Sequence, residues 1–326
     1  MLTSPGPVSR RRRGLFRRGL STGDARWGFF MSLPTTVVLL FLVIIPALWT
    51  ISLAFQHVTL LNLHSASLLG PFTFSNIVQV VQQPGFVAAL TATLAYSVFG
   101  TLLSVTFGLA AALSLRNRFR GRAIIRGAML IPYVAPVVAA TYIWQVMLDP
   151  TFGFVNEVGT TLLGWQHAIP FLSQQSGHLP VVGNSFTVPT ALITVILFDA
   201  WRYFPFAFLF FTARLQLVSR ELEEAASIDG ATVSQRFRYI IFPQLRNVTV
   251  LLVILRFIWT FNKFDDVYLL TGGAAGTTMI SIRVYQFLTA FGNVGTSSAQ
   301  ALLLAAALAV FVIIYASTQA RARREV

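Results

Sequence analysis

Three long stretches of this chain contain no charged residue, and they limit what the chain can fold into more than any other feature. No Asp, Glu, Lys or Arg occurs at positions 27–115, 127–148 or 284–320. A helix that crosses a membrane needs about 20 consecutive apolar residues, and each stretch can supply at least one. Charged residues make up 11% of the chain, against about 25% in soluble domains. The sequence therefore predicts an all-α integral membrane protein.

The apolar segments divide into six predicted membrane-spanning helices, residues 29–55, 86–115, 124–148, 188–215, 248–270 and 298–317. Several contain proline, which membrane helices tolerate because neighbouring helices satisfy the freed carbonyl groups. We therefore expect one six-span membrane domain, residues 28–318. A basic N-terminal tail, residues 1–27, precedes it, and a short C-terminal tail, residues 319–326, follows it.

The basic residues are expected on one side of these helices. All but four of the 24 lie in the two tails or in the second-to-third and fourth-to-fifth connections. The loops on the other side, residues 56–85 and 149–187, contain none. Because basic residues stay on the cytoplasmic side, we expect a multi-pass protein of the bacterial plasma (inner) membrane with both termini in the cytoplasm. This placement explains the net charge of +13 without a nucleic-acid partner.

The N-terminal tail also resembles a signal peptide, because its arginines precede an apolar run. That run is too long for a signal-peptide core, and no small-residue cleavage site closes it. We interpret it as the first span, uncleaved.

The residue types that carry most enzymatic chemistry are scarce. The chain has no Cys and four His, none paired at metal-ligand spacing, so we predict no metal site and no catalytic residue. It also lacks the G-x-x-x-x-G-K-[ST] phosphate-binding loop. We therefore expect the chain to bind no cofactor and to hydrolyse no ATP itself, which makes an intramembrane enzyme a poor alternative. A proton- or sodium-coupled secondary transporter is the stronger alternative, but that class usually shows internal repeats, and the halves of this chain show none.

The fourth-to-fifth connection, residues 217–246, has the pattern of a helix–turn–helix hairpin. Ser219 is placed to cap a first helix whose first turns carry carboxylates that favour the positive helix end, Glu221, Glu223 and Glu224. Asp229 and Gly230 are placed to end that helix, because glycine readily takes the left-handed conformation found there.

A second helix is expected directly after that turn. Thr232 and Gln235 form a capping-box pattern at its start, and Pro243 is expected to stop it. Three apolar residues at helical spacing are expected to share one face, namely Val233, Phe237 and Ile240.

This segment resembles the EAA motif of ABC importer permeases, E-A-A-x3-G-x9-I-x-L-P. The matching residues all lie at the spacing of the motif, with Phe242 in place of the leucine: Glu224, Ala225, Ala226, Gly230, Ile240 and Pro243. The resemblance implies a type I ABC importer permease, with six transmembrane helices and a cytoplasmic coupling-helix hairpin. It also implies that the hairpin docks in a groove of a separate ATPase, through Glu224, Ala225, Ala226, Asp229, Gly230, Ala231, Phe237, Ile240 and Pro243.

A second resemblance narrows the family. FNKFDDVYLLTGG, residues 261–273, is similar to the F-x-x-F-D-x-x-Y-x-L-T-G-G-G-P segment of carbohydrate-type permeases, the maltose and glycerol-phosphate importer family. Ala274 and Ala275 replace its last Gly-Pro. The likeness covers about residues 86–317, and it implies ATP-driven, binding-protein-dependent import of a disaccharide, an amino sugar or a glycerol phosphate.

The same likeness implies the partners of the chain. They are a second homologous permease subunit, two ABC ATPase subunits that hold ATP and Mg, and an extracytoplasmic solute-binding protein. Membrane lipid surrounds the spans, and the chain itself is a non-catalytic subunit.

Charged residues inside the predicted spans are costly and therefore mark candidate contacts for a polar solute. Sugars present hydroxyl groups to charged or amide side chains and ring faces to aromatic ones. The candidates are Asp199, Trp201, Arg202, Tyr203, Phe206, Arg256, Thr260, Asn262, Lys263 and Asp265. An alternative with equal standing is that these charges pair with one another, Asp199 with Arg202 or Arg256 and Asp265 with Lys263, and only hold the helices together.

Overall fold

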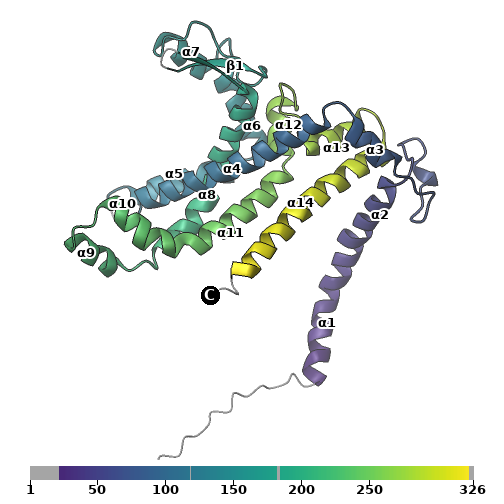
Figure 1. Ribbon diagram of the computed structural model, residues 1–326, viewed down its shortest axis with the longest axis horizontal. Coiled ribbons are helices and arrows are strands. Elements are labelled where there is room, and N and C mark those ends of the chain that lie inside the picture. The colour runs from purple at the N-terminus through teal and green to yellow at the C-terminus, as the bar shows by residue number, and fades with distance from the viewer. Residues whose placement is uncertain (1–21, 118, 182–183, 323–326) are drawn as a thin grey trace, which may run out of the picture. The chain divides into compact units, whose positions relative to one another are not determined.

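The computed structural model describes residues 22–322 apart from 118, 182 and 183 (Figure 1). Most of the expected basic tail, residues 1–21, lies outside the described residues, as do residues 323–326. The chain divides into two units, residues 1–50 and 51–326. The first unit consists of helix α1 (Thr22–Leu39), the π-helical turn η1 (Leu40–Ile44) and the start of helix α2 (Ile45–Ala54).

The second unit is built on four long helices, α4 (Phe86–Ser114), α8 (Thr190–Leu215), α11 (Phe242–Phe261) and α14 (Val294–Ala322). The most extensive helix–helix contact joins α4 and α8. Gly108 makes this possible, because a Cβ atom built on it would lie 2.5 Å from Cβ of Ala207 and 2.8 Å from the carbonyl oxygen of Phe204. Small residues let membrane helices approach closely.

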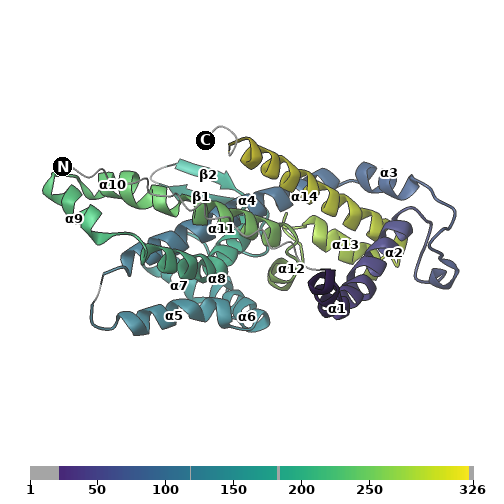
Figure 2. The same ribbon diagram turned by 90° about the horizontal axis from the view of Figure 1, so that it is seen from below.

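The third predicted span is a broken helix. It consists of α5 (Arg122–Val134) and α6 (Val137–Leu148), which meet at an angle of 97°. Pro136 explains the break, because proline has no N–H group and pushes the residue before it out of the helical conformation; Ala135 has ψ 139°. In both views α5 lies beside α8 (Figure 2).

Within the described residues, five helices are long and apolar enough to cross a membrane, and the bent α5–α6 pair makes six if it is counted as one span. This agrees with the six predicted spans. The fifth span was placed wrongly, at residues 248–270. The helix instead runs from Val233 to Phe261, through α10 (Val233–Arg236), the π-helical turn η3 (Phe237–Ile241) and α11. Residues after Phe261 form the separate short helix α12 (Asp265–Thr271).

The prediction that Pro243 stops the hairpin's second helix was also wrong. Proline normally breaks a helix because it lacks an N–H group and clashes with the carbonyl four residues earlier. Here the π turn η3 ends at Ile241, two residues before Pro243. A π turn shifts the bonding from four to five residues, and this accommodates the ring. The turn η1 likewise ends at Ile44, two residues before Pro46.

The connections hold the shorter elements, which are η2 (Leu63–Ser65), α3 (Ser75–Gln82), α7 (Phe154–Thr161), β1 (Gly177–Val181), β2 (Asn184–Val188), α9 (Arg220–Ile228) and α13 (Ile280–Thr289). Strands β1 and β2 pair antiparallel, with Gly177 opposite Val188. The sequence did not predict this hairpin, which is the one exception to the predicted all-α fold among the described residues. It precedes α8, whereas α9 follows α8, so the two connections lie at opposite ends of that helix (Figure 1).

Candidate functional site

The hairpin of α9 and α10 has the turn that the sequence predicts. Asp229 is the C-cap of α9, and Gly230 follows with φ +82°. The amide of Ala231 donates to the carbonyl of Ala226 at 2.9 Å, and the amide of Gly230 to that of Ser227 at 3.2 Å. These are the two bonds of a Schellman motif, which needs a left-handed residue at this position. The role of Gly230 in ending the helix is therefore confirmed.

The capping box at the start of α10 is also confirmed. The amide of Thr232 donates to Oε1 of Gln235 at 2.7 Å, and the amide of Gln235 donates to Oγ1 of Thr232 at 3.3 Å. Ser219 occupies the N-cap position of α9, but its side chain makes no capping bond. The two helices thus meet at a turn fixed from both sides, by Gly230 and by Thr232.

The predicted apolar face of the second helix was wrong in part. Val233 is 74% exposed, whereas Phe237 and Ile241 pack into a core cluster with Leu245 and with residues of α4 and α8. The extra residue in the π turn η3 rotates the face, so Ile241 rather than Ile240 points inward. The hairpin is therefore attached to the membrane helices through the root of its second helix.

The tip of the hairpin presents apolar side chains outward. Ile228 is 87% exposed and Val233 is also exposed on the other side of the turn, while Leu222 is exposed near the start of α9. The small motif residues beside them are accessible, since Ala225 and Gly230 are both exposed. Exposed apolar side chains of this kind are typical of surfaces that contact another protein or a membrane.

A further contact ties the hairpin to the connection after α4. Arg116 and Glu223 form a two-point ion pair, with Nη2 to Oε1 at 2.5 Å and Nη1 to Oε2 at 2.8 Å. The contact at 2.8 Å is a hydrogen bond between two charged groups, a class that is stronger than bonds between neutral groups. Nothing in the sequence pattern singled out either residue as a partner of the other, because they belong to different connections.

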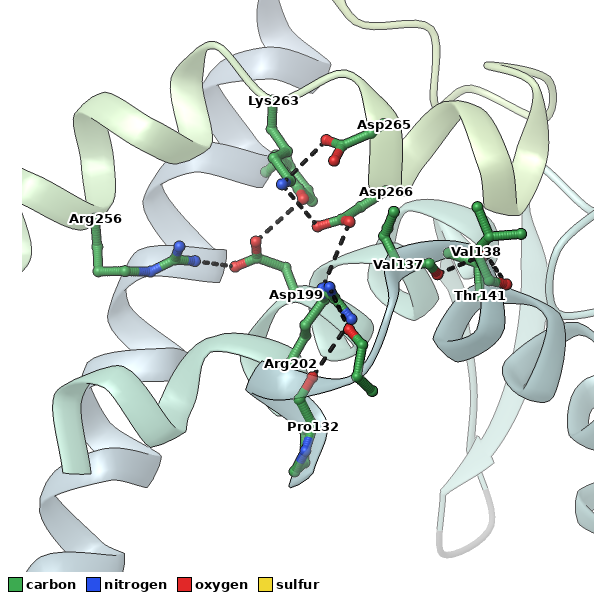
Figure 3. Close-up of polar contacts among 12 residues, drawn as sticks. Pro132, Val137, Val138, Thr141, Asp199, Arg202, Arg256, Lys263, Asp265 and Asp266 are labelled. Carbon is green, nitrogen blue, oxygen red and sulfur yellow. Dashed lines mark hydrogen bonds and ion pairs between the residues drawn. The ribbon is translucent and has the colours of Figure 1, made fainter. Parts of the chain in front are cut away.

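The charged residues of the spans form ion pairs (Figure 3). These pairs show which of the two possible partners Asp199 has. Asp199 pairs with Arg256 at 2.7 Å, not with Arg202. Asp199 also accepts a hydrogen bond from the hydroxyl of Tyr96 at 3.2 Å, and Nε of Arg256 donates to Oγ of Ser104 at 3.3 Å. Both charges are buried, so each depends on the other for compensation.

Arg202 closes the break in the third span. Its guanidinium donates to the carbonyl of Ala135 at 3.0 Å and to that of Pro132 at 3.4 Å, groups that the break between α5 and α6 leaves without helical donors. It also lies 3.8 Å from the carboxylate of Asp266. One arginine on α8 therefore joins the bend to α12 (Figure 3).

Lys263 completes the cluster. It lies 3.0 Å from Asp265, the pairing that the sequence left open, and 3.5 Å from Asp266. Asp266 was missed among the candidates although it is fully buried. The signal that was available is its position beside Asp265 in an otherwise apolar segment.

The candidate contacts for a solute separate into buried and accessible groups. Asp199, Arg256 and Thr260 are buried within the chain, and Trp201 packs against Trp144 and Phe198. The accessible or partly accessible candidates are Trp201, Tyr203, Phe206, Asn262, Lys263 and Asp265.

The accessible group lies beside an aromatic row that joins α5, α8 and α11. The ring centroid of Phe206 lies 5.1 Å from Trp259, 4.9 Å from Phe210 and 6.2 Å from Tyr133. The ring of Tyr203 lies 6.2 Å from Tyr133 and carries Nζ of Lys263 at 4.9 Å. Trp259, Phe210 and Tyr133 were not predicted as candidates.

Comparisons with known proteins agree on one family. The family model described as "Binding-protein-dependent transport system inner membrane component" matches residues 104–324. The inner membrane ABC transporter permease protein YcjO of Escherichia coli is 31% identical over 293 residues, which cover 90% of this chain and 92% of its own length. The trehalose/maltose transport system permease protein MalF of Thermococcus litoralis is 30% identical over 295 residues, 90% of this chain and 93% of its own.

A solved structure shows the same fold. The chain matches a bacterial ABC transporter involved in the import of the acidic polysaccharide alginate with a TM-score of 0.75, over 92% of this chain and 96% of that one, at 19% sequence identity. Together with the apolar spans, these matches establish that the chain is a multi-pass membrane protein and belongs to the family of binding-protein-dependent transport system inner membrane components, the permeases of ABC transporters.

Proposed function

We propose that the chain is the permease subunit of an ATP-driven importer and that separate ATPase subunits act on it through the hairpin of α9 and α10. The observation that carries this proposal is the exposed apolar turn, with Ile228 at the end of α9 and Val233 at the start of a helix that continues into a membrane span. A partner that buried these side chains would hold the end of that span that carries the hairpin. The motif residues Glu224 to Gly230 lie on this hairpin, and Ile240 and Pro243 lie in η3 and α11, which continue its second helix.

The solute is proposed to be a sugar or a related molecule. The supporting observations are the names of the relatives, which include trehalose, maltose and maltodextrin permeases, and the aromatic row beside Asn262, Lys263 and Asp265. Aromatic faces with a few polar groups at their edge suit a sugar ring and its hydroxyl groups. The buried ion pairs of Asp199 and Arg202 then hold in place the helices that carry this surface, and they do not contact the solute themselves.

The remaining parts of the importer are proposed by the same reasoning. A second permease subunit completes the path, two ATPase subunits bind ATP and Mg, and a solute-binding protein delivers the solute on the other side. The hairpin faces the cytoplasm together with both termini, because the basic residues gather on that side. The membrane domain covers residues 28–318, with tails 1–27 and 319–326.

The hairpin contact is tested by co-purification of the ATPase with the tagged permease from membranes. Ile228→Glu places a charge in the exposed apolar tip and should abolish co-purification, while the amount of permease in the membrane stays unchanged. Ile228→Leu is the matched control, because it keeps the apolar surface and should retain the ATPase. Full retention of the ATPase by Ile228→Glu would refute the docking role.

A further inference from the structure

A cavity of about 720 Å³ lies where α4 ends, α5 begins and α8 gives way to α9. Four arginines contribute to its wall, Arg116, Arg122, Arg126 and Arg220. Within the described part of the chain, no acidic side chain lines it. Four like charges around one cavity repel one another, so the cavity is electrostatically suited to an anion.

The charges are only partly compensated by the protein. Arg116 pairs with Glu223, and Arg126 donates from Nη2 to the carbonyl of Leu115 at 3.1 Å. The Nε atom of Arg126 is buried and makes no hydrogen bond to any described residue. Among the described residues, no carboxylate lies within 4.0 Å of Arg126 or Arg220. An incoming anion would therefore meet donors that are not already committed to a carboxylate.

The position of the cavity points to a lipid. Ala112 and Leu215, on its wall, belong to the last turns of two apolar spans, Phe86–Ser114 and Thr190–Leu215. The cavity thus begins at the depth where the apolar surface of the helices ends. Leu217, also on the wall, is an exposed apolar side chain. A phospholipid offers a phosphate and acyl chains in this arrangement, and basic pockets between membrane helices bind such headgroups.

We propose that this cavity binds the phosphate of an anionic phospholipid headgroup, with Arg122, Arg126 and Arg220 as donors and with the acyl chains against Leu217. Guanidinium groups suit this role, because their planar set of donors matches a phosphate. The inference does not depend on the identity of the transported solute or on the ATPase. It has a structural consequence, because Arg220 is the first residue of α9 and Arg116 holds Glu223: a bound headgroup fixes the root of the hairpin.

The test is native mass spectrometry of the purified full-length permease, titrated with phosphatidylglycerol and separately with phosphatidylcholine of the same acyl chains. The wild-type chain should bind phosphatidylglycerol at least about tenfold more tightly. The double variant R122Q/R220Q should bind it about 30-fold more weakly than wild type, since each basic residue contributes about fivefold near a membrane surface. R122K/R220K keeps both charges and should retain most of the affinity.

The matched control is R120Q/R238Q, which removes two exposed arginines from the same side of the chain but not from the cavity. It should bind as wild type does. Equal binding of the two lipids by wild type, or equal weakening by the control, would overturn the proposal.

Addition of millimolar inorganic phosphate tests whether the bound anion is a lipid headgroup or free phosphate. Retention of the lipid supports the headgroup, whereas complete displacement assigns the cavity to free phosphate and overturns the lipid assignment. If R122Q/R220Q fails to fold, the comparison of the two lipids on the wild-type chain still tests the proposal.

Discussion

Arg116 and Glu223, 107 residues apart in the sequence, form an ion pair with a closest approach of 2.5 Å and one hydrogen bond of 2.8 Å. Arg116 follows the end of α4, and Glu223 lies in the first turn of α9. The pair therefore fastens the hairpin to a helix other than the two that it connects. A force applied to the hairpin reaches α4 through this contact as well as α11 through the chain.

Breaking this pair should uncouple the hairpin from α4. Arg116→Glu and Glu223→Arg each place like charges side by side and should reduce solute-driven ATP hydrolysis by the assembled transporter about tenfold or more, since a hydrogen-bonded pair of charges contributes about 1.5–3 kcal/mol. The double variant R116E/E223R restores opposite charges and should recover much of the activity. A double variant no better than either single one would show that the pair carries no coupling.

The buried pair of Asp199 and Arg256 should respond differently to single and double substitution. Asp199→Asn leaves the arginine buried without its carboxylate and should lower the free energy of unfolding by about 3–5 kcal/mol. The double variant D199L/R256M removes both charges and should cost less than the single one. Thermal unfolding of the detergent-purified chain measures both, and a double variant less stable than D199N would contradict this account.

The packing of α4 on α8 should be disrupted by a larger residue at Gly108. Gly108→Ala puts a Cβ atom 2.5 Å from that of Ala207, so the helices must separate, and we expect a clear fall in the unfolding temperature. Gly127→Ala on α5 is the matched control, because its Cβ would meet nothing within 4 Å. It should stabilise the chain by up to about 1 kcal/mol, through better helix propensity. Equal effects of the two substitutions would refute the close approach at Gly108.

The aromatic row should affect transport without affecting assembly. Trp259→Ala removes one ring from it and should lower solute uptake about 2- to 10-fold, the size expected for one aromatic contact. Trp259→Phe should retain most of the uptake. Phe99→Ala, an exposed aromatic on α4 outside the row, should have no effect on uptake in membrane vesicles. An effect of Phe99→Ala as large as that of Trp259→Ala would argue against a solute surface at the row.

Local chemistry was predictable from the sequence. The turn at Gly230 and the capping box of Thr232 and Gln235 depend on residues a few positions apart, so the pattern alone contains them. The number of spans was predictable for a similar reason, because a membrane helix must satisfy its backbone within an apolar segment of fixed length.

Features that depend on distant residues were not predictable in this way. The carbonyl groups of Pro132 and Ala135, which the helix break leaves without helical donors, accept hydrogen bonds from Arg202. No local sequence pattern predicts that the donor comes from another helix. The π turn before Pro243 turns Ile241 rather than Ile240 toward α4 and α8, whereas propensity alone predicted that the helix would end at the proline. The pairing of Asp199 with Arg256 rather than Arg202 likewise depends on the arrangement of three helices.

The helix from Val233 to Phe261 contains 29 residues and, at 1.5 Å per residue, is about 43 Å long. Because hairpin and span are one rod, a tilt of a few degrees at Val233 becomes a sideways shift of several ångströms at Phe261, just before Lys263 and Asp265. The π turn at residues 237–241 is the one irregularity along the rod as described, and its stiffness would set how much of a push applied at one side of the membrane arrives at the other.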